Sequence, residues 1–333
     1  MPGVIDTDRF SAVLRQRGVD RETERVLIAD LRESQQEHDL SEPVNCGGFG
    51  RVRHFRQTTR PGWPTNPLPI APAARALGIA VPEVLRAQVF QNAVCNWRCW
   101  YCFVDFPLLS GDPKRSTSLT SAELVDLYLA EADRPAMLDL SGGQPDLVPE
   151  WVAWMLAELR GRGLEVYVWS DDNLSNDYFF SKLVPDERAV IEGDVRYGKV
   201  CCFKGFDETS FAFNTQAAPE LFFRQFELMR RLLAETSLDL YAYVTFTSPA
   251  YEAIAAKMRA FVDRLQEIDA NLPLRTVPLE ISVFSPVAPR MTDPHERALA
   301  VQQEAVTAWN EELVRRYSDA ERAAAITDVT LRD

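Results

Sequence analysis

Two hydrophobic periods alternate along most of the chain, and together they predict an α/β fold. Short apolar runs typical of buried strands occupy residues 85–92, 136–141, 165–170, 199–205, 239–247 and 277–284. Longer segments with helical spacing separate them at residues 120–132, 148–163, 218–236 and 250–268. This alternation predicts a parallel sheet with right-handed crossovers. Because six strands are too few for an eight-stranded barrel, we expect a partial (β/α)6 TIM-like barrel.

The two ends of the chain carry different patterns. Residues 8–18 and 20–40 have helical spacing and predict two helices, whereas residues 41–72 are rich in Gly and Pro and predict an irregular segment covering the domain or a site. Another long helix is expected at residues 293–317. We therefore divide the chain into a helical and Pro/Gly-rich extension (1–85), a barrel core (86–290), and a C-terminal helix with a tail (291–333).

Polar segments follow several of the predicted strands directly. They are the cysteine-containing residues 92–102, "SGGQP" at 141–145, "SDDN" at 170–173 and "KGFDE" at 204–208. In parallel α/β folds the carboxyl ends of the strands meet at one edge, where ligands bind. We therefore expect these segments to lie together on one rim.

Composition narrows the possible partners and location. The chain has 333 residues, of which 46% are hydrophobic, with no apolar run long enough to predict a membrane span. The net charge of −13 argues against nucleic acid as a partner, because phosphate binding depends on clustered Lys and Arg. The six cysteines are not spaced as a disulfide framework, and residues 1–18 resemble an amphipathic helix rather than a secretion signal. We expect a cytoplasmic protein without a membrane partner.

Three of those cysteines fall within "NAVCNWRCWYC", residues 92–102. Cys95, Cys99 and Cys102 have the spacing C-x3-C-x2-C. A zinc site usually has four Cys or His ligands, and the histidines, His38, His54 and His295, are all distant in sequence. Thiolates also bind iron–sulfur clusters, and three ligands on four irons leave one iron open to a substrate or cofactor. A zinc site and a 4Fe–4S cluster are the two interpretations at this point.

The spacing and its setting resemble the radical S-adenosylmethionine (radical SAM) superfamily. "CNWRCWYC" is similar to the superfamily's C-x3-C-x-aromatic-C signature, and "LDLSGGQP" at 138–145 is similar to its Gly-Gly-Glu segment. "CCFKGFDE" at 201–208 resembles the Lys-Gly segment of the pyruvate formate-lyase-activating branch. The resemblance spans residues 86–285. It implies a 4Fe–4S cluster on Cys95, Cys99 and Cys102 that cleaves SAM reductively to a 5′-deoxyadenosyl radical, which abstracts hydrogen from a substrate.

The resemblance also implies which residues bind SAM. Tyr101 would lie near the adenine, and Lys204 would meet the SAM carboxylate. Gly142 and Gly143 would let the backbone approach the methionyl ammonium closely. Gln144 stands where the superfamily has glutamate, so its amide oxygen would accept a hydrogen bond from the ammonium without supplying charge.

Candidates for catalytic or substrate-binding roles are Asp139, Asp171 and Cys202. Asp139 alternates with leucines along its strand, which predicts that it points into the barrel. Asp171, with Asp172 and Asn173, either binds a substrate amine, hydroxyl or cation, or caps a helix. Alternation places Cys202 on the same face as Lys204, with Cys201 on the opposite face, although both thiols also fit ordinary packing roles.

Several functions remain open at the level of sequence. The first is a radical SAM enzyme acting on a small molecule or a peptide, with a glycyl-radical-enzyme activase as one version. The second is a non-enzymatic scaffold that binds zinc or a cluster. RNA modification is disfavoured by the charge. For an enzyme we expect flavodoxin or ferredoxin as the electron donor, attracted by Arg98, Lys114 and Arg115.

Overall fold

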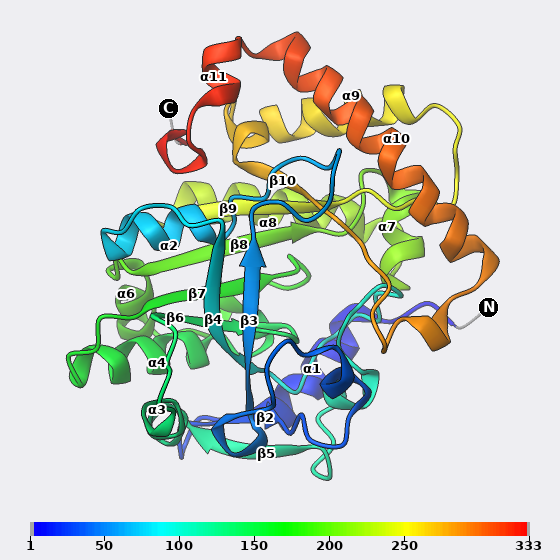
Figure 1. Cartoon of the computed structure of the whole chain (residues 1–333). Helices are drawn as coiled ribbons and strands as arrows, with labels where there is room; N and C mark the ends of the chain where they lie inside the picture. The colour runs from blue at the N-terminus through cyan, green and yellow to red at the C-terminus, as the bar shows by residue number, and fades with distance from the viewer. Residues whose placement is uncertain (1–2, 332–333) are drawn as a thin grey trace.

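The computed structural model describes residues 3–331, apart from the side chains of residues 38 and 39, and a curled seven-stranded sheet forms its centre (Figure 1). The strand order is β10-β9-β8-β7-β6-β4-β3, and β4 to β10 in this sheet are parallel, whereas β3 is antiparallel to β4. The bounds are β3 Gly50–Arg56, β4 Val84–Gln91, β6 Met137–Ser141, β7 Tyr167–Asp172, β8 Tyr197–Phe203, β9 Leu240–Thr245 and β10 Thr276–Leu279. The sheet is a half-barrel, as the sequence predicted in outline.

Helices connect the parallel strands and cover one face of the sheet. They are α3 Ser121–Ala130, α4 Glu150–Gly161, α5 Tyr178–Ser181, α6 Pro185–Glu192, α7 Glu208–Thr215, α8 Leu221–Glu235 and α9 Ile254–Gln266. The long helix α10 Asp293–Arg316 and the short α11 Asp319–Ala323 follow the last strand. Helix α3 begins at a capping box, in which Thr120 accepts from the N–H of Glu123 and the Glu123 carboxylate accepts from the N–H of Thr120.

The six parallel strands overlap the six expected segments, although β10 ends at Leu279 and not near residue 284, and the sheet departs from a simple (β/α)6 count. The added strand β3 lies at the edge next to β4. Some crossovers contain two helices, as between β7 and β8 (α5 and α6) and between β8 and β9 (α7 and α8).

The amino-terminal expectations were partly wrong. Residues 7–18 form a helix, α1 Thr7–Gly18, but the predicted helix at 20–40 is instead β1 Val19–Asp20, β2 Arg25–Ala29 and a short 3-10 turn. Strand β2 pairs with β5 Ser116–Thr120 and with β1 in a small antiparallel sheet, at the bottom of Figure 1. Its "RVLIA" buries Val26 and Ile28 in the core, the alternation of a strand.

The Gly/Pro-rich segment 41–72 is also more ordered than expected. It contains strand β3, and helix α2 Ile70–Leu77 starts at its end. Leu68, Ile70 and Ala73 pack in one cluster with Tyr167 and Trp169 from the inner face of the sheet. Residues 68–73 therefore close the barrel interior near the amino ends of the strands, leaving the carboxyl ends for polar groups.

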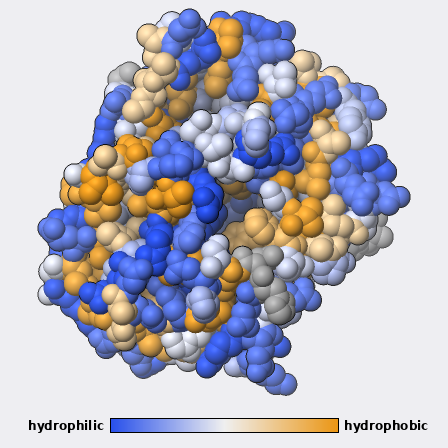
Figure 2. All heavy atoms as spheres, in the orientation of Figure 1, coloured by the Kyte–Doolittle hydropathy of each residue, from blue (hydrophilic) through white to orange (hydrophobic). Residues whose placement is uncertain are grey.

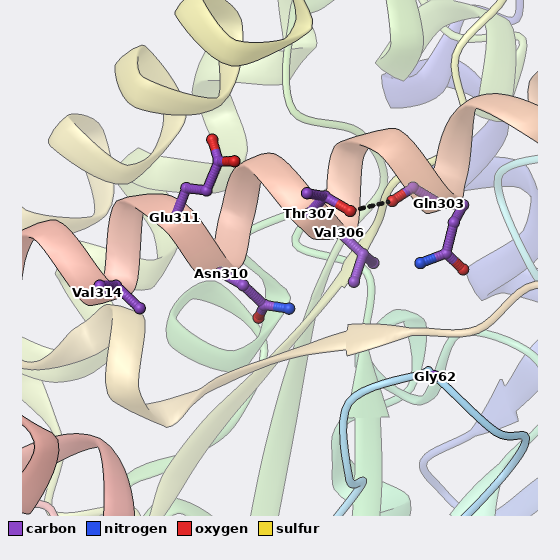
Figure 3. A pocket seen from close by; sticks show the side chains of 7 residues that line it. All are labelled: Gly62, Gln303, Val306, Thr307, Asn310, Glu311 and Val314. Carbon is purple, nitrogen blue, oxygen red and sulfur yellow. Dashed lines mark hydrogen bonds between the residues drawn. The ribbon is translucent and has the colours of Figure 1, made fainter.

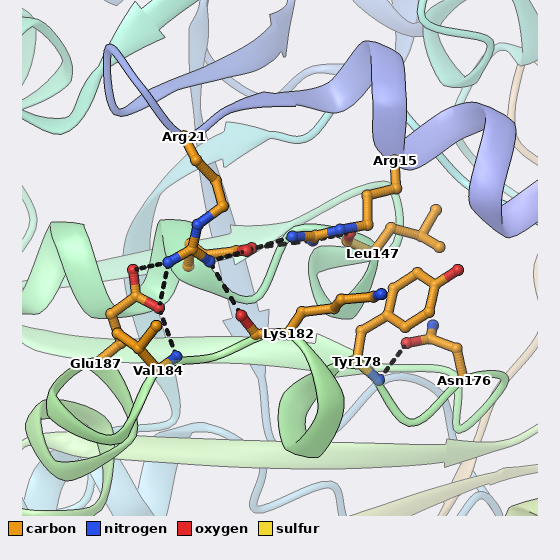
Figure 4. A network of polar contacts seen from close by, with 9 residues as sticks. Arg15, Arg21, Leu147, Asn176, Tyr178, Lys182, Val184 and Glu187 are labelled. Atoms are coloured by element: carbon orange, nitrogen blue, oxygen red, sulfur yellow. Dashed lines mark hydrogen bonds and ion pairs between the residues drawn. The ribbon is translucent and has the colours of Figure 1, made fainter.

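Helix α1 is tied to the barrel by buried polar contacts. Arg15 and Arg21 both bind the fully buried carboxylate of Glu150, at the start of α4, and Arg21 also binds Glu187 of α6 (Figure 4). A buried carboxylate is stable when such cations and hydrogen bonds surround it. The network thus joins the amino-terminal segment to the crossovers on either side of β7. No helix within residues 3–331 has the length and apolar character needed to cross a bilayer.

Glu150→Gln should therefore destabilise the protein. We expect the free energy of unfolding to fall by about 1–3 kcal/mol, since two arginines lose their shared counter-charge but one of them is partly solvated. Urea denaturation followed by circular dichroism measures this change. Glu165→Gln is the matched control, because Glu165 binds Arg196 in an exposed pair. Equal effects of the two substitutions would contradict a structural role for the Glu150 network.

Candidate functional site

The three clustered cysteines lie on the loop that leaves β4, at the carboxyl ends of the parallel strands. Cys95, Cys99 and Cys102 are free thiols of intermediate exposure. The loop is held by arginines: Arg98 donates to the carbonyl oxygens of Cys95 and Trp97 (2.6 and 2.9 Å), and Arg290 donates to that of Cys102 (2.8 Å). Both cations bind backbone oxygens of the loop.

The sulfur atoms of Cys99 and Cys102 are buried, and a cation lies near Cys99. Burial raises the pKa of Cys99 to about 12, against the opposing effect of the nearby Lys204 ammonium. Burial also raises the pKa of Cys102, and the adjacent Cys95 adds to this rise. Within the described residues, no three Cys, His, Asp or Glu side chains are arranged to hold a single metal ion. A cubane cluster takes one thiolate per iron, and three soft donors on one loop fit that requirement in number and type.

The Gly-Gly turn after β6 fits tightly against the start of the cysteine loop. A Cβ on Gly143 would lie 2.7 Å from the carbonyl oxygen of Val94 and closer still to that of Asn92. Gly142 has φ +79°, a conformation that favours glycine, and the N–H of Gln144 donates to Val94 (2.8 Å). Gly143 is therefore the glycine that lets the turn pack on the start of the cysteine loop, whereas a Cβ on Gly142 would meet the side chain of Gln91. Contact of the two glycines with SAM stays a prediction.

The side chain of Gln144 also has a structural role. It is 1% exposed, its Nε2 donates to Asp172 (2.8 Å), and its Oε1 accepts from the backbone N–H of Asn173 (2.9 Å). Both ends of the amide are thus occupied at the end of β7. This placement makes Gln144 a positioning residue for two loops, and its contact with the SAM ammonium stays a prediction.

A buried ion cluster supports the same turn from the helix-facing side of the sheet. The Lys199 ammonium contacts Asp146 at 2.6 Å and lies 3.9 Å from Asp172. Burial alone would lower the pKa of Lys199, but Asp146 and its other acidic neighbours raise it, so this side chain stays charged. Asp172 also accepts from the N–H of Leu174 (2.8 Å), and the Asn173 amide donates to Asn96 (3.0 Å). Of the two interpretations of "SDDN", local anchoring therefore describes Asp172 and Asn173.

The other expected residues gather on the inner side of the rim. Lys204 follows β8 and lies near Cys202, Tyr101, Cys99 and Asp171, whose negative forms raise the pKa of its ammonium although burial opposes this. The Tyr101 hydroxyl is 3.1 Å from that of Thr245 at the end of β9. The structure thus brings residues from the cysteine loop, β7, β8 and β9 to one place.

The alternation expected along β8 is confirmed. Cys202 packs in the inner-face cluster with Trp169 and Tyr243, whereas Cys201 packs in the main core beneath the helices. The prediction that the two thiols face opposite sides of the sheet therefore holds.

Asp139 also faces the interior, as its pattern predicted. It lies between Val89 on β4 and Trp169 on β7, and it is fully buried. Burial and the carboxylate of Asp171 raise the pKa of Asp139 to about 7. Arg53 on β3 is the nearest cation, with an N–O distance of 3.8 Å.

Two site residues were missed by sequence reasoning, Arg51 and Arg53. Both point from β3 into the half-barrel, where their guanidinium groups lie over the ring of Phe103. The sequence feature that could have identified them is "GRVRHFR" at 50–56, in which side chains alternate between the two faces of a strand. It is hard to recognise as a buried strand because two of its inward positions are basic.

In the orientation of Figure 1, the surface of the molecule is hollowed near its middle, beside β3 (Figure 2). A separate pocket of about 360 Å³ lies between the loop at Gly62 and one side of α10, lined by Val306, Asn310 and Val314 among others (Figure 3). None of the site residues discussed above lines that second pocket.

Comparison with known proteins gives limited similarity. No protein-family model matches the chain, and no curated protein matches its sequence. Solved structures similar in fold include SuiB of Streptococcus suis bound to the precursor peptide SuiA, with 14% identity and a TM-score of 0.37, covering 53% of this chain and 36% of that one. SuiB bound to S-adenosylmethionine has 16% identity and a TM-score of 0.42, covering 68% of this chain and 47% of that one. The present chain thus spans less than half the length of either, and likeness at this level does not assign an activity.

Gly143→Ala tests the packing of the Gly-Gly turn on the cysteine loop. The new methyl group must displace the backbone at Asn92 and Val94, which should lower the free energy of unfolding by about 1–3 kcal/mol. Gly161→Ala at the end of α4 is the control, because a Cβ there meets no atom within 4 Å. Urea denaturation compares the two, and a G143A variant as stable as G161A would contradict the packing.

Asp139→Asn should stabilise the protein, and the gain should depend on pH. Because the folded-state pKa of Asp139 is raised from 3.8 to about 7, the folded protein binds this proton more tightly, and wild-type stability falls as the pH rises through that window. We expect D139N to exceed the wild type by at least about 1 kcal/mol near pH 7.5, and by less near pH 5. Urea denaturation at several pH values measures the difference, with Asp133→Asn at an exposed position as the control. A pH-independent difference would contradict the assignment.

Proposed function

We propose that this chain is a radical SAM enzyme, most similar in its motifs to the pyruvate formate-lyase-activating branch. The observation that carries the proposal is the placement of three free thiols, a Gly-Gly turn and a lysine on one rim of a half-barrel. The thiols supply soft ligands, the turn fixes their loop, and the lysine adds a cation beside Cys99. Together these features suit a cluster with one open iron, next to a site for an anionic chelating ligand.

Each group has a definite task in this proposal. Cys95, Cys99 and Cys102 would hold the 4Fe–4S cluster, Lys204 would bind the SAM carboxylate as a point charge, and Tyr101 would lie near the adenine. When bound, the cluster and SAM supply the electron and the 5′-deoxyadenosyl radical that abstracts hydrogen from the substrate. The protein's own residues position these groups and keep water away from them.

The inner face of the sheet provides the substrate chamber. Tyr167, Trp169 and Tyr241 fill the part nearer the amino ends of the strands, with Trp169 directly beside Asp139. The hydrogen donor would therefore sit between these rings and Asp171, which lies further along β7 toward the rim. The donor would be a small molecule or a peptide. The aromatic floor excludes water, which protects a reactive radical from side reactions.

An electron donor and a location complete the proposal. Lys114 is exposed near the cysteine loop and could attract an acidic flavodoxin or ferredoxin, whereas the Arg98 guanidinium turns toward loop carbonyls. We place this reaction in the cytoplasm, where thiols stay reduced, and expect neither a membrane nor a nucleic-acid partner.

Formation of 5′-deoxyadenosine tests the proposal directly. Anaerobically reconstituted protein, given SAM and a strong reductant, should bind about four irons per chain and release methionine and 5′-deoxyadenosine. Cys99→Ala should lose the open-iron cluster and at least about 99% of this activity, because the cluster no longer has its three ligands.

Cys46→Ala is the matched control, since Cys46 is a buried free thiol outside the loop. It should retain both iron and activity. Wild-type protein that binds zinc in place of iron, and that yields no 5′-deoxyadenosine under conditions where a known radical SAM enzyme does, would contradict the proposal.

A further inference from the structure

The inner face of the half-barrel contains a buried arginine, Arg51, with two N–H groups that have no hydrogen-bond acceptor in the described chain. Arg51 on β3 is 6% exposed, yet its Nε and Nη2 have no hydrogen-bond partner among the residues that the structure describes. Burial lowers the pKa of this guanidinium to about 10, which leaves it charged at neutral pH. A buried cation with free donors is costly, and folded proteins usually pair such groups.

Complementary groups lie on the neighbouring strands of the same face. Neither carboxylate oxygen of Asp139 is hydrogen-bonded within residues 3–331, and the same holds for Ser141 Oγ and Gln91 Nε2. Arg51 on β3 pairs with Val89 on β4, and Val89 pairs with Asp139 on β6. Arg51 and Asp139 therefore lie two strands apart at the same level of the sheet, with Cα atoms roughly 10 Å from each other. Gln91 and Ser141 pair directly, one step closer to the rim. This set therefore places both free donors and free acceptors on neighbouring strands of one face of the sheet.

The ionisable side chains of the inner face include both cations and carboxyl groups. Lys204 is assigned to the SAM carboxylate. Near the rim, the other ionisable groups that the structure describes on the inner face include the guanidinium groups of Arg51 and Arg53 and the carboxyl groups of Asp139 and Asp171, and burial raises the pKa of both carboxyl groups. The only one of these cations that approaches a carboxylate within the described chain is Arg53, and its 3.8 Å distance to Asp139 is long for an ion pair. Ordered water can satisfy an amide or a hydroxyl, but it does not neutralise a guanidinium. A ligand with one negative and one positive group would satisfy both sides.

We propose that the substrate of this site is a free amino acid or a closely similar zwitterion, whose carboxylate binds Arg51 and whose ammonium binds Asp139. The inference rests on the proposed function, because it names the hydrogen donor of that same chamber. Arg51 can present Nε and Nη2 together to a carboxylate, the fork geometry that favours bidentate binding. The side chain of the amino acid would then face the aromatic floor at Trp169 and Tyr243. An internal residue of a peptide has neither charge and would leave both groups unpaired.

Equilibrium dialysis tests this assignment without turnover. Reconstituted protein, saturated with SAM and given no reductant, is dialysed against an equimolar mixture of the proteinogenic amino acids, and retained molecules are quantified by mass spectrometry. Parallel dialyses use the N-acetyl and the amide forms, which each lack one charge. We expect at least one free amino acid to be retained, and its capped forms to bind at least about tenfold more weakly, because each loses a charge-assisted hydrogen bond.

Variants connect the binding to the named residues. Arg51→Met should weaken amino-acid binding at least about tenfold, and Arg56→Met, at an exposed position of the same strand, should leave it unchanged. Asp139→Asn gives a second test in a variant expected to remain folded, and it should weaken binding of the ammonium group similarly. Retained SAM is measured in the same samples.

Three outcomes would overturn the inference. The first is that wild-type protein retains no amino acid, and the second is that it retains the capped forms or a peptide equally well. The third is that R51M releases SAM together with the amino acid, which would assign Arg51 to SAM itself. Production of 5′-deoxyadenosine by the same wild-type preparation separates these failures from failure of the proposed function.

Discussion

The contact between the Gly-Gly turn and the cysteine loop is the constraint on which the rest of the site depends. Gly143 lies against the carbonyl oxygens of Asn92 and Val94, so the loop that carries the thiols has its start fixed by β6. Other parts of the fold hold the same loop from different sides. Asn96 donates to Ser11 of α1 (2.8 Å), Trp100 donates to Asn214 of α7 (3.0 Å), and Arg290 binds the carbonyl of Cys102. Segments from the whole length of the chain therefore converge on residues 92–102.

The two faces of the sheet have different roles: the helix-facing side stabilises the fold, and the inner side carries the candidate site. The helix-facing side is mostly apolar, and its buried charges Lys199, Asp146 and Asp172 contact one another. The inner face is apolar only near the amino ends of the strands. Toward the carboxyl ends it carries Arg51 and Asp139 without satisfied partners in the described chain, an arrangement that lowers stability and is typical of a binding site.

The sequence predicted the parts of the fold whose hydrophobic pattern is local. The six parallel strands, the capping box at Thr120 and the opposite faces of Cys201 and Cys202 all follow from spacing along single segments. Strand β3 was missed because its inward positions carry Arg51 and Arg53, whose burial depends on the interior that distant strands create. The predicted helix at 20–40 failed because the helical spacing of its charges concealed the short apolar run of β2.

The same limit applies to the structural contacts of Gln144, which the sequence did not predict. Its identity was clear from the sequence, but its partners Asp172 and Asn173 lie 28 and 29 positions away and become neighbours only when β6 and β7 pair. The sequence did predict which residues gather at the rim, because each of them follows or ends a parallel strand. They are Cys99, Tyr101, Asp171 and Lys204. The motifs in the sequence thus predicted which residues lie on the rim. Only the tertiary contacts show which of them support the loops and which face the inner side of the sheet.

The central claim is that three thiolates hold a four-iron cluster with one iron free to bind SAM. Electron paramagnetic resonance of the anaerobic, reduced protein, recorded with and without SAM, tests it most directly. The account predicts the signal of a reduced 4Fe–4S cluster whose g values shift when SAM is added. A reduced cluster whose spectrum ignores SAM, or fully reconstituted protein that shows no four-iron cluster, would contradict it.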